Sequence, residues 1–186
     1  MAAKIEPLLT VSDLDATPND NNHYELIEGE LFVSCAPSIP HQIIITNLIL
    51  AFGDHLEAHP LGVVIPGPGV IFSEHDAVIP DLVFITHERR AEIAAGDKVL
   101  GAPDLLIEVM SPGIENRQRD EVVKRQLYGK YGVKEYWIVD PENRALEVFR
   151  FDRHSLKKTA ALTGEDELTM PLLAGFSLIV SHIFKF

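Results

Sequence analysis

The stretch Asp104-Leu-Leu-Ile-Glu-Val-Met110 places one acidic residue, Glu108, inside a run of aliphatic residues. A short apolar run of this kind predicts a buried strand. Because side chains alternate along a strand, Glu108 shares a face with Asp104 and Met110. A carboxylate in such a place is costly unless something neutralises it. The stretch therefore predicts a central strand that carries a charged group into the core.

Two further segments supply charged groups that could meet Glu108. Ile79-Pro-Asp-Leu-Val-Phe-Ile85 is a second apolar run, and its Asp81 directly follows a proline. The segment of residues 118–131 has helical periodicity and contains Lys124. Two carboxylates and a lysine are the minimum needed to hold a divalent cation against a phosphate and to activate a water. The three residues therefore predict a nuclease-type site.

Each of the three residues also has a structural explanation. Asp81 could begin a strand or a turn, as aspartate often does after proline. Glu108 could pair with a lysine or arginine from elsewhere in the chain. Lys124 could form an ordinary i, i+4 pair with Asp120 on a solvated helix face. The site prediction depends on the two carboxylates and the lysine coming together.

The predicted helix of residues 118–131 has two rows of side chains at i+4 spacing. The first row is apolar and is expected to form the buried stripe: Val123, Leu127 and Tyr131. The second lies about 100° away: Asp120, Lys124 and Tyr128. Lys124 is therefore expected at the border of the buried face, and alanine at this position is expected to leave the fold intact.

Further elements are expected from turn residues and periodicity. These are a strand pair over residues 24–34, a helix from His41 to about Glu57, short strands within residues 61–72, a strand at 78–85, a short helix at 87–95, and strands at 136–139 and 145–151. Residues 172–180 read as closing apolar elements.

Several blocks of the sequence occur together, in this order, in one known family. They are Tyr24-Glu-Leu-Ile-Glu-Gly-Glu30, Ser38-Ile-Pro-His41, Val78-Ile-Pro-Asp-Leu-Val-Phe84, Gly101-Ala-Pro-Asp-Leu-Leu-Ile-Glu-Val-Met-Ser-Pro112, Tyr128 and Gly132-Val-Lys-Glu-Tyr-Trp-Ile-Val-Asp-Pro141. On these blocks, which cover roughly residues 20–152, the chain resembles the Uma-type restriction endonuclease family of the PD-(D/E)XK nuclease superfamily.

The resemblance implies an α/β (α+β) fold with a restriction-endonuclease-like mixed central sheet flanked by helices. It implies that Asp81 is the metal-binding aspartate and Glu108 the second acid, together holding Mg²⁺ or Mn²⁺. The superfamily pattern places a lysine two residues after the second acid, where this chain has Met110. The resemblance implies that Lys124 does this work from the next helix. The function it implies is a metal-dependent endonuclease that hydrolyses DNA phosphodiester bonds.

Three more residues are candidates for supporting the site. His41 opens the long helix in a family-like block, and a structural role at the helix start explains it equally well. Asp104 shares a strand face with Glu108, and Tyr128 shares a helix row with Lys124.

Composition sets the broad class of the protein. A chain of 186 residues, 46% hydrophobic and 24% charged, suits one folded domain over residues 1–186, with a polar lead-in over about residues 1–22. No apolar run is long enough to span a bilayer, so no membrane partner is expected. The single Cys35 cannot form an internal disulfide, which suits the cytoplasm.

Net charge opposes the nuclease interpretation. With a formal net charge of −12 at pH 7, the chain repels phosphates at long range. Basic residues nevertheless cluster after the proposed site and predict a local basic edge that could hold DNA: Arg117, Arg119, Lys124, Arg125, Lys130 and Lys134. A solvated helix of mixed charge is an equal alternative.

The sequence is also compatible with two other functions, and it predicts a homodimer. The fold could serve as a non-catalytic module that binds nucleic acid or protein, which is favoured if Lys124 does not reach the carboxylates. It could also be a metal-dependent phosphoesterase acting on small phosphates. A homodimer is expected because the tail is rich in apolar residues, although these could instead close the monomer core: Phe176, Ile179, Ile183, Phe184 and Phe186.

Overall fold

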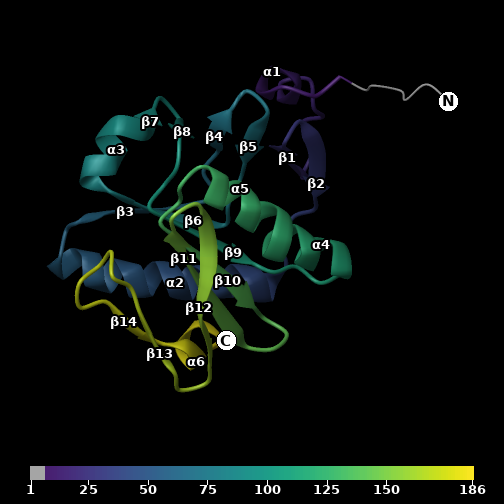
Figure 1. The fold of residues 1–186 in the computed structure, drawn as a ribbon. Coiled ribbons are helices and arrows are strands. Elements are labelled where there is room, and N and C mark those ends of the chain that lie inside the picture. Colours follow the sequence, from purple (N-terminus) through teal and green to yellow (C-terminus); the bar gives the residue numbers. More distant parts are fainter. Residues whose placement is uncertain (1–6) are drawn as a thin grey trace.

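A mixed six-stranded sheet forms the centre of the protein, whose computed structural model describes residues 7–186 (Figure 1). In chain order its strands are β3 (Gly62–Pro66), β6 (Leu82–Thr86), β9 (Leu105–Val109), β10 (Glu135–Asp140), β11 (Ala145–Asp152) and β12 (Ser155–Thr163). They lie side by side as β12-β11-β10-β9-β6-β3. Only β9 and β10 are parallel neighbours among these strands. The predicted mixed sheet is confirmed.

A second six-stranded sheet, which the sequence did not reveal, is built mostly from the N-terminal half. Its strands are β1 (His23–Ile27), β2 (Glu30–Ser34), β4 (Val70–Ser73), β5 (Asp76–Val78), β7 (Ala94–Ala95) and β8 (Lys98–Leu100). The expected strand pair at 24–34 is the β1–β2 hairpin of this sheet. A small hairpin of β13 (Glu167–Thr169) and β14 (Ser177–Ile179) follows near the C-terminus.

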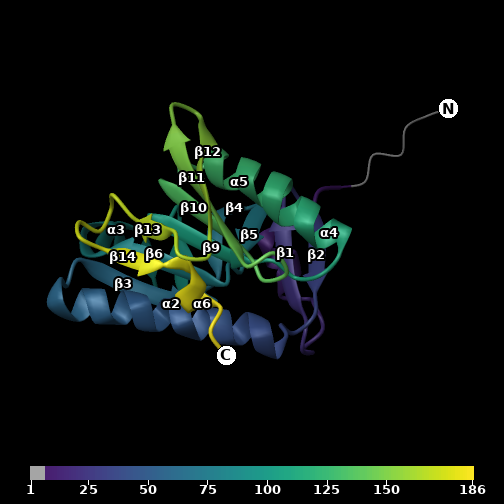
Figure 2. The same cartoon turned by 90° about the horizontal axis from the view of Figure 1, so that it is seen from below.

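Helices cover both sides of the central sheet (Figure 2). The helices of the described residues are α1 (Val11–Leu14), α2 (Ile39–Ala58), α3 (His87–Ile93), α4 (Ile114–Gln118), α5 (Arg125–Lys130) and α6 (Val180–Ile183), and a π-helical segment η1 (Arg119–Lys124) joins α4 to α5. The long helix α2 begins where the Ser38 hydroxyl accepts a hydrogen bond from the His41 N–H and where Pro40 fits the first turn. None of the helices within residues 7–186 is long and apolar enough to cross a bilayer.

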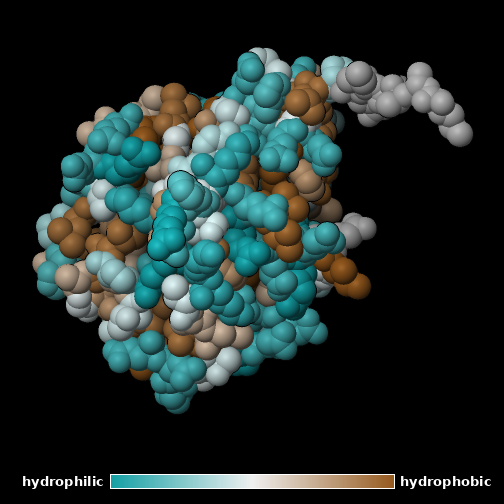
Figure 3. Space-filling view, viewed as in Figure 1, coloured by the Kyte–Doolittle hydropathy of each residue, from teal (hydrophilic) through white to brown (hydrophobic). Residues whose placement is uncertain are grey.

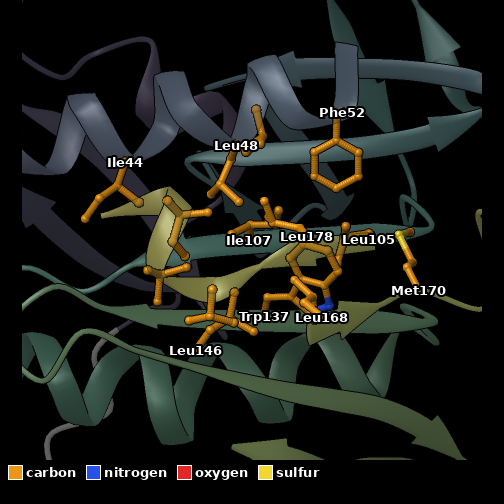
Figure 4. Close-up of a cluster of buried hydrophobic side chains, with 14 of the residues drawn as sticks. Ile44, Leu48, Phe52, Leu105, Ile107, Trp137, Leu146, Leu168, Met170 and Leu178 are labelled. Carbon is orange, nitrogen blue, oxygen red and sulfur yellow. The ribbon is translucent and has the colours of Figure 1, made fainter. Parts of the chain in front are cut away.

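Alternation along β9 divides the core into two clusters. Leu105, Ile107 and Val109 face α2, in a cluster that includes Phe52 and Trp137 (Figure 4). The opposite face, with Leu106 and Met110, packs against α5 and the second sheet. Glu108 belongs to this second face, as its place in the strand predicts.

The expected strand at 78–85 is interrupted before Asp81. β5 ends at Val78 and β6 begins at Leu82, so Ile79 to Asp81 connect two different sheets. Pro80 has no N–H to donate to a ladder, which explains the break. Asp81 therefore lies at the entry to β6 rather than within a strand.

The apolar tail closes the monomer core. Phe176, Ile183 and Phe184 are all at most 2% exposed and pack in the cluster beneath α2. Only Phe186 of the tail residues named above is strongly exposed, at 75%. The expectation that these residues form an exposed surface is wrong, because amino-acid type alone does not reveal which apolar residues fold back onto the sheet. They give no basis for a homodimer.

Asp76 joins β5 to the β1–β2 turn and to α5. Its carboxylate, 1% exposed, accepts hydrogen bonds from the Glu28 N–H at 2.7 Å and from the Tyr131 hydroxyl at 2.6 Å. Burial opposes ionisation, but these bonds and the Lys130 ammonium hold the pKa of Asp76 below its ordinary value of 3.8.

Asp76→Asn is therefore expected to lower the free energy of unfolding by roughly 1–3 kcal/mol at neutral pH. A carboxyl group whose folded-state pKa is depressed stabilises the fold above its unfolded pKa and loses that contribution as pH falls through the folded value. Urea unfolding from pH 7 to pH 3 should show wild type and variant converging in acid. A difference that stays constant over this range would contradict the assignment.

Candidate active site

The two predicted acids lie beside each other at one end of the central sheet. Strands β6 and β9 are antiparallel neighbours with Leu82 opposite Ile107, a register that brings Asp81 across from Glu108. One oxygen of Asp81, Oδ2, accepts a hydrogen bond of 2.7 Å from the Val109 N–H. The Asp81 side chain is thereby tied to the residue next to Glu108.

Lys124 reaches the acids from the helix above. Its ammonium donates to Glu108 Oε1 at 2.9 Å and lies 3.0 Å from Glu25 Oε1. The Tyr128 hydroxyl donates to the same Glu108 oxygen at 2.7 Å. Lys124 is only 2% exposed, so its removal would leave two buried carboxylates uncompensated. The expectation that alanine at this position leaves the fold intact is therefore wrong.

The π-helical segment η1 differs from the regular helix predicted for residues 118–131. Asp120 and Lys124, both 2% exposed, point into the protein, whereas Val123 is only partly buried. The charged row is thus buried together with Leu127 of the apolar row, which is 3% exposed. This is possible because Glu108 and Glu25 neutralise Lys124. Inserted π turns are frequent at functional sites, where they change the direction of side chains.

Of the three supporting candidates, His41 and Tyr128 join the cluster and Asp104 does not. His41 Nε2 lies 3.1 Å from Asp81 Oδ2, and the ring is 5% exposed. Asp104 lies at the opposite end of β9, where it accepts hydrogen bonds from Thr86 and forms an ion pair with Lys134. Four residues along a strand span about 13 Å, which explains why sharing a face does not bring Asp104 to Glu108.

Sequence reasoning missed Glu25 and Asp120. Glu25, 2% exposed, accepts a hydrogen bond from the Ile79 N–H at 2.8 Å and forms a second ion pair with Lys124. Its signal was present, because it too is an acid in an apolar strand, Tyr24-Glu-Leu-Ile27. Asp120 lies within 3.4 Å of the Arg119 guanidinium. The cluster thus holds more carboxylates than cations: Glu25, Asp81, Glu108 and Asp120 against Lys124 and Arg119.

Burial and mutual repulsion set the protonation of this cluster. Burial raises the pKa of Glu108 to about 8, against the opposing effect of Lys124 and with the help of the other acids. Burial also raises the pKa of Asp120. Burial alone would lower the pKa of Lys124, but Glu108 and Glu25 raise it above its ordinary value. Lys124 is therefore expected to stay charged at neutral pH.

The donor set suits a hard divalent cation with an incomplete protein shell. Within residues 7–186, no three His, Cys, Asp or Glu side chains are grouped as metal ligands. Mg²⁺ is commonly bound by one or two carboxylates, with waters and substrate phosphates completing its shell. Both hydrogen bonds to the Asp81 side chain go to Oδ2 and both to Glu108 go to Oε1, so among the described residues one oxygen of each acid stays free.

A cleft of about 840 Å³ opens beside the acids. His41 and Met110 line it, together with the loop before α2, the start of α4 and the β10–β11 turn. His41 contacts Asp81, and Met110 follows the residue that binds Asp81. The cleft is thus linked to Asp81 through His41 and Met110, while Asp81, Glu108 and Lys124 themselves do not line it.

The predicted basic edge is largely neutralised. Five of its six residues pair with carboxylates. These pairs are Arg117 with Asp140, Arg119 with Asp120, Lys124 with Glu108, Lys130 with Asp76 and Lys134 with Asp104. Little free positive charge is therefore left at these five residues, because carboxylates, most of them distant in sequence, meet the side chains in the fold.

Comparisons with known proteins show the family and the fold. The sequence matches the model of the Uma2 family, described as "Putative restriction endonuclease", over residues 11–181. No curated protein matches the sequence. Among solved structures, the fold resembles a "putative nuclease belonging to DUF820" from Anabaena variabilis, with a TM-score of 0.76 and 17% identity over 95% of this chain and 97% of that one. At this identity the match shows the fold alone.

Proposed function

The chain belongs to the Uma2 family of restriction-endonuclease-like proteins, and we propose that it is a metal-dependent endonuclease that hydrolyses DNA phosphodiester bonds. Asp81, Glu108 and Lys124 are the proposed catalytic residues. The observation that carries the proposal is the 2.9 Å contact between the Lys124 ammonium and Glu108, because it supplies the lysine that Met110 cannot. Residues far apart in the sequence meet at this contact.

Asp81 and Glu108 would hold Mg²⁺ or Mn²⁺ through their free oxygens. The cation, when bound, supplies Lewis-acid polarisation of the phosphate and activation of water. The excess of carboxylates over cations in the cluster supports this assignment, since a divalent ion relieves their repulsion.

Lys124 stabilises negative charge that develops on the phosphate. An ammonium has three N–H donors, and two of them face Glu108 and Glu25. The third would be offered to a phosphate oxygen brought to the site, and the raised pKa would keep the group charged during the reaction.

His41, Tyr128 and Glu25 position the reacting groups. His41 directs the free oxygen of Asp81 by holding the other one, and Tyr128 does the same for Glu108. Glu25 holds the Lys124 ammonium in place through their ion pair. Burial, and then contact with Glu108, raise the pKa of the Tyr128 hydroxyl well above its usual value, so Tyr128 stays a hydrogen-bond donor.

We further propose that residues 1–186 form a single domain and that the protein acts in the cytoplasm. Homodimerisation stays a prediction. It rests only on the fact that nucleases that cut both DNA strands commonly act as dimers.

Supercoiled plasmid DNA should be converted to nicked and linear forms in the presence of Mn²⁺ or Mg²⁺, and EDTA or Asp81→Asn should abolish the conversion. A protein that hydrolyses only a small phosphodiester, such as bis(p-nitrophenyl) phosphate, would be a phosphoesterase instead. A folded protein that hydrolyses neither substrate with any divalent metal would be a binding module.

A further inference from the structure

A basic groove lies between α5 and the start of β12, away from the cleft. It has a volume of about 480 Å³ and is lined by Arg125, Gln126, Gly129, Lys130 and residues 154–158. α5 and β12 approach each other closely at Gly129. A Cβ added to this glycine would lie only 3.2 Å from the Leu156 backbone nitrogen. Hydrophilic side chains cover the surface where α5 and β12 meet (Figure 3).

The charge of this groove is opposite to that of the rest of the molecule. Four cations line it, Arg125, Lys130, Lys157 and Lys158, and no carboxylate does. In three other clefts of the described residues, carboxylates outnumber lysines and arginines. For a chain of net charge −12, such a concentration of cations is a local reversal of the surface potential.

Two of the four cations have no carboxylate partner within residues 7–186. Lys130 pairs with Asp76 and Lys158 with Glu147. Arg125 instead lies over the Phe149 ring, 5.3 Å from its centroid, and Lys157 is exposed. These two charges are available to an anion.

The groove and the cleft lie at opposite ends of one helical segment. Arg117 lines the cleft and Arg125 lines the groove. Eight residues of helix span about 12 Å, a length that a duplex of only a few base pairs covers. An anion that contacts both places must therefore be extended, with charges repeated along its length.

We propose that the basic groove binds the phosphate backbone of a nucleic-acid duplex and so anchors the substrate beside the cleft. The inference rests on the proposed nuclease function for its choice of anion. Arg125 and Lys157 are the principal contacts, and Lys130 and Lys158 add to the field. Binding at this groove is expected to be largely independent of base sequence, since contacts to phosphates carry no sequence information.

The test measures binding without cleavage, in EDTA, by fluorescence anisotropy of a fluorescein-labelled DNA duplex over a range of salt concentrations. Arg125→Gln with Lys157→Gln should reduce the slope of log affinity against log salt by about 2, since each phosphate contact contributes roughly 0.9. The matched control is Lys98→Gln with Lys185→Gln, which removes the same charge from two exposed lysines outside the groove. The control should leave the slope unchanged.

The binding measurements test the groove independently of whether the protein cleaves DNA. An equal change in slope for both double variants, or no change in either, would overturn the groove assignment even if the protein cleaves DNA. Binding of anionic phospholipid vesicles through Arg125 and Lys157, with no binding of the duplex, would also overturn it. A groove-dependent slope in a protein that cleaves nothing would support the groove and refute the nuclease function.

Discussion

Replacing Lys124 with alanine is expected to abolish metal-dependent DNA cleavage and to lower the free energy of unfolding by about 3–5 kcal/mol. The ammonium is 2% exposed and lies within 3.0 Å of two carboxylates. Its loss removes the positive charge that faces the phosphate and leaves Glu25 and Glu108 buried without a cation. Plasmid cleavage and urea unfolding measure the two effects.

A second variant separates the loss of chemistry from the loss of stability. Lys124→Met combined with Glu25→Gln removes one cation and one of the two carboxylates that face it, so the cluster loses a charge pair rather than a lone cation. The double variant should be more stable than Lys124→Ala, should still bind metal through Asp81 and Glu108, and should not cleave. Cleavage by this variant at a rate near that of the wild type would refute the role of Lys124. Lys130→Ala, on the same helical segment but outside the site, should keep its cleavage rate at low salt.

The second large effect concerns the metal. Mn²⁺ or Mg²⁺ should raise the thermal stability of the wild type, because a ligand that binds only the folded state at about 100 times its dissociation constant adds about 2.7 kcal/mol. Asp81→Asn and Glu108→Gln should show almost no rise, since each removes one of the two carboxylates that would hold the ion. Differential scanning calorimetry with and without the metal measures the shift.

Asp104→Asn is the matched control for the metal effect. Asp104 is also buried and lies next to β9, but its partners are Thr86 and Lys134 at the far end of the strand. This variant should have a lower baseline stability and the full rise with metal. The same rise in all four proteins would place the metal elsewhere.

The sequence was most informative where a charge interrupts an apolar pattern. Glu108 in β9 was identified from its run of aliphatic neighbours, and it lies in the cluster. Glu25 carries the same signal in β1, but the pattern of residues 24–34 was fully explained by a hairpin. The role of Glu25 depends on its contact with Lys124, across about a hundred residues of chain, which no local pattern contains.

The helix around Lys124 shows why periodicity was insufficient. The rows at i+4 spacing assume a regular α-helix, in which an apolar row should face the core. In the π turn of residues 119–124, Asp120 and Lys124 are buried as well, and Lys124 is neutralised by its ion pairs. Whether a charged residue is buried depends on partners from other elements, and those partners are set by the tertiary fold.

The distribution of basic residues shows the same limit. The cluster that is continuous in sequence, residues 117–134, is mostly paired with distant acids such as Asp140 and Asp76. The groove that gathers cations in space combines Arg125 with Lys157, which lies on a hairpin far along the chain. Net charge and local charge runs therefore predicted neither the neutralised edge nor the basic groove.

The most direct test of the site is a crystal structure of the protein soaked in Mn²⁺, with anomalous scattering used to locate the ion. We expect a peak about 2.1 Å from one carboxylate oxygen of Asp81 and one of Glu108, with the Lys124 ammonium still in contact with Glu108. A peak on other residues, or a well-ordered cluster in which Asp81 and Glu108 bind no ion at saturating Mn²⁺, would contradict it.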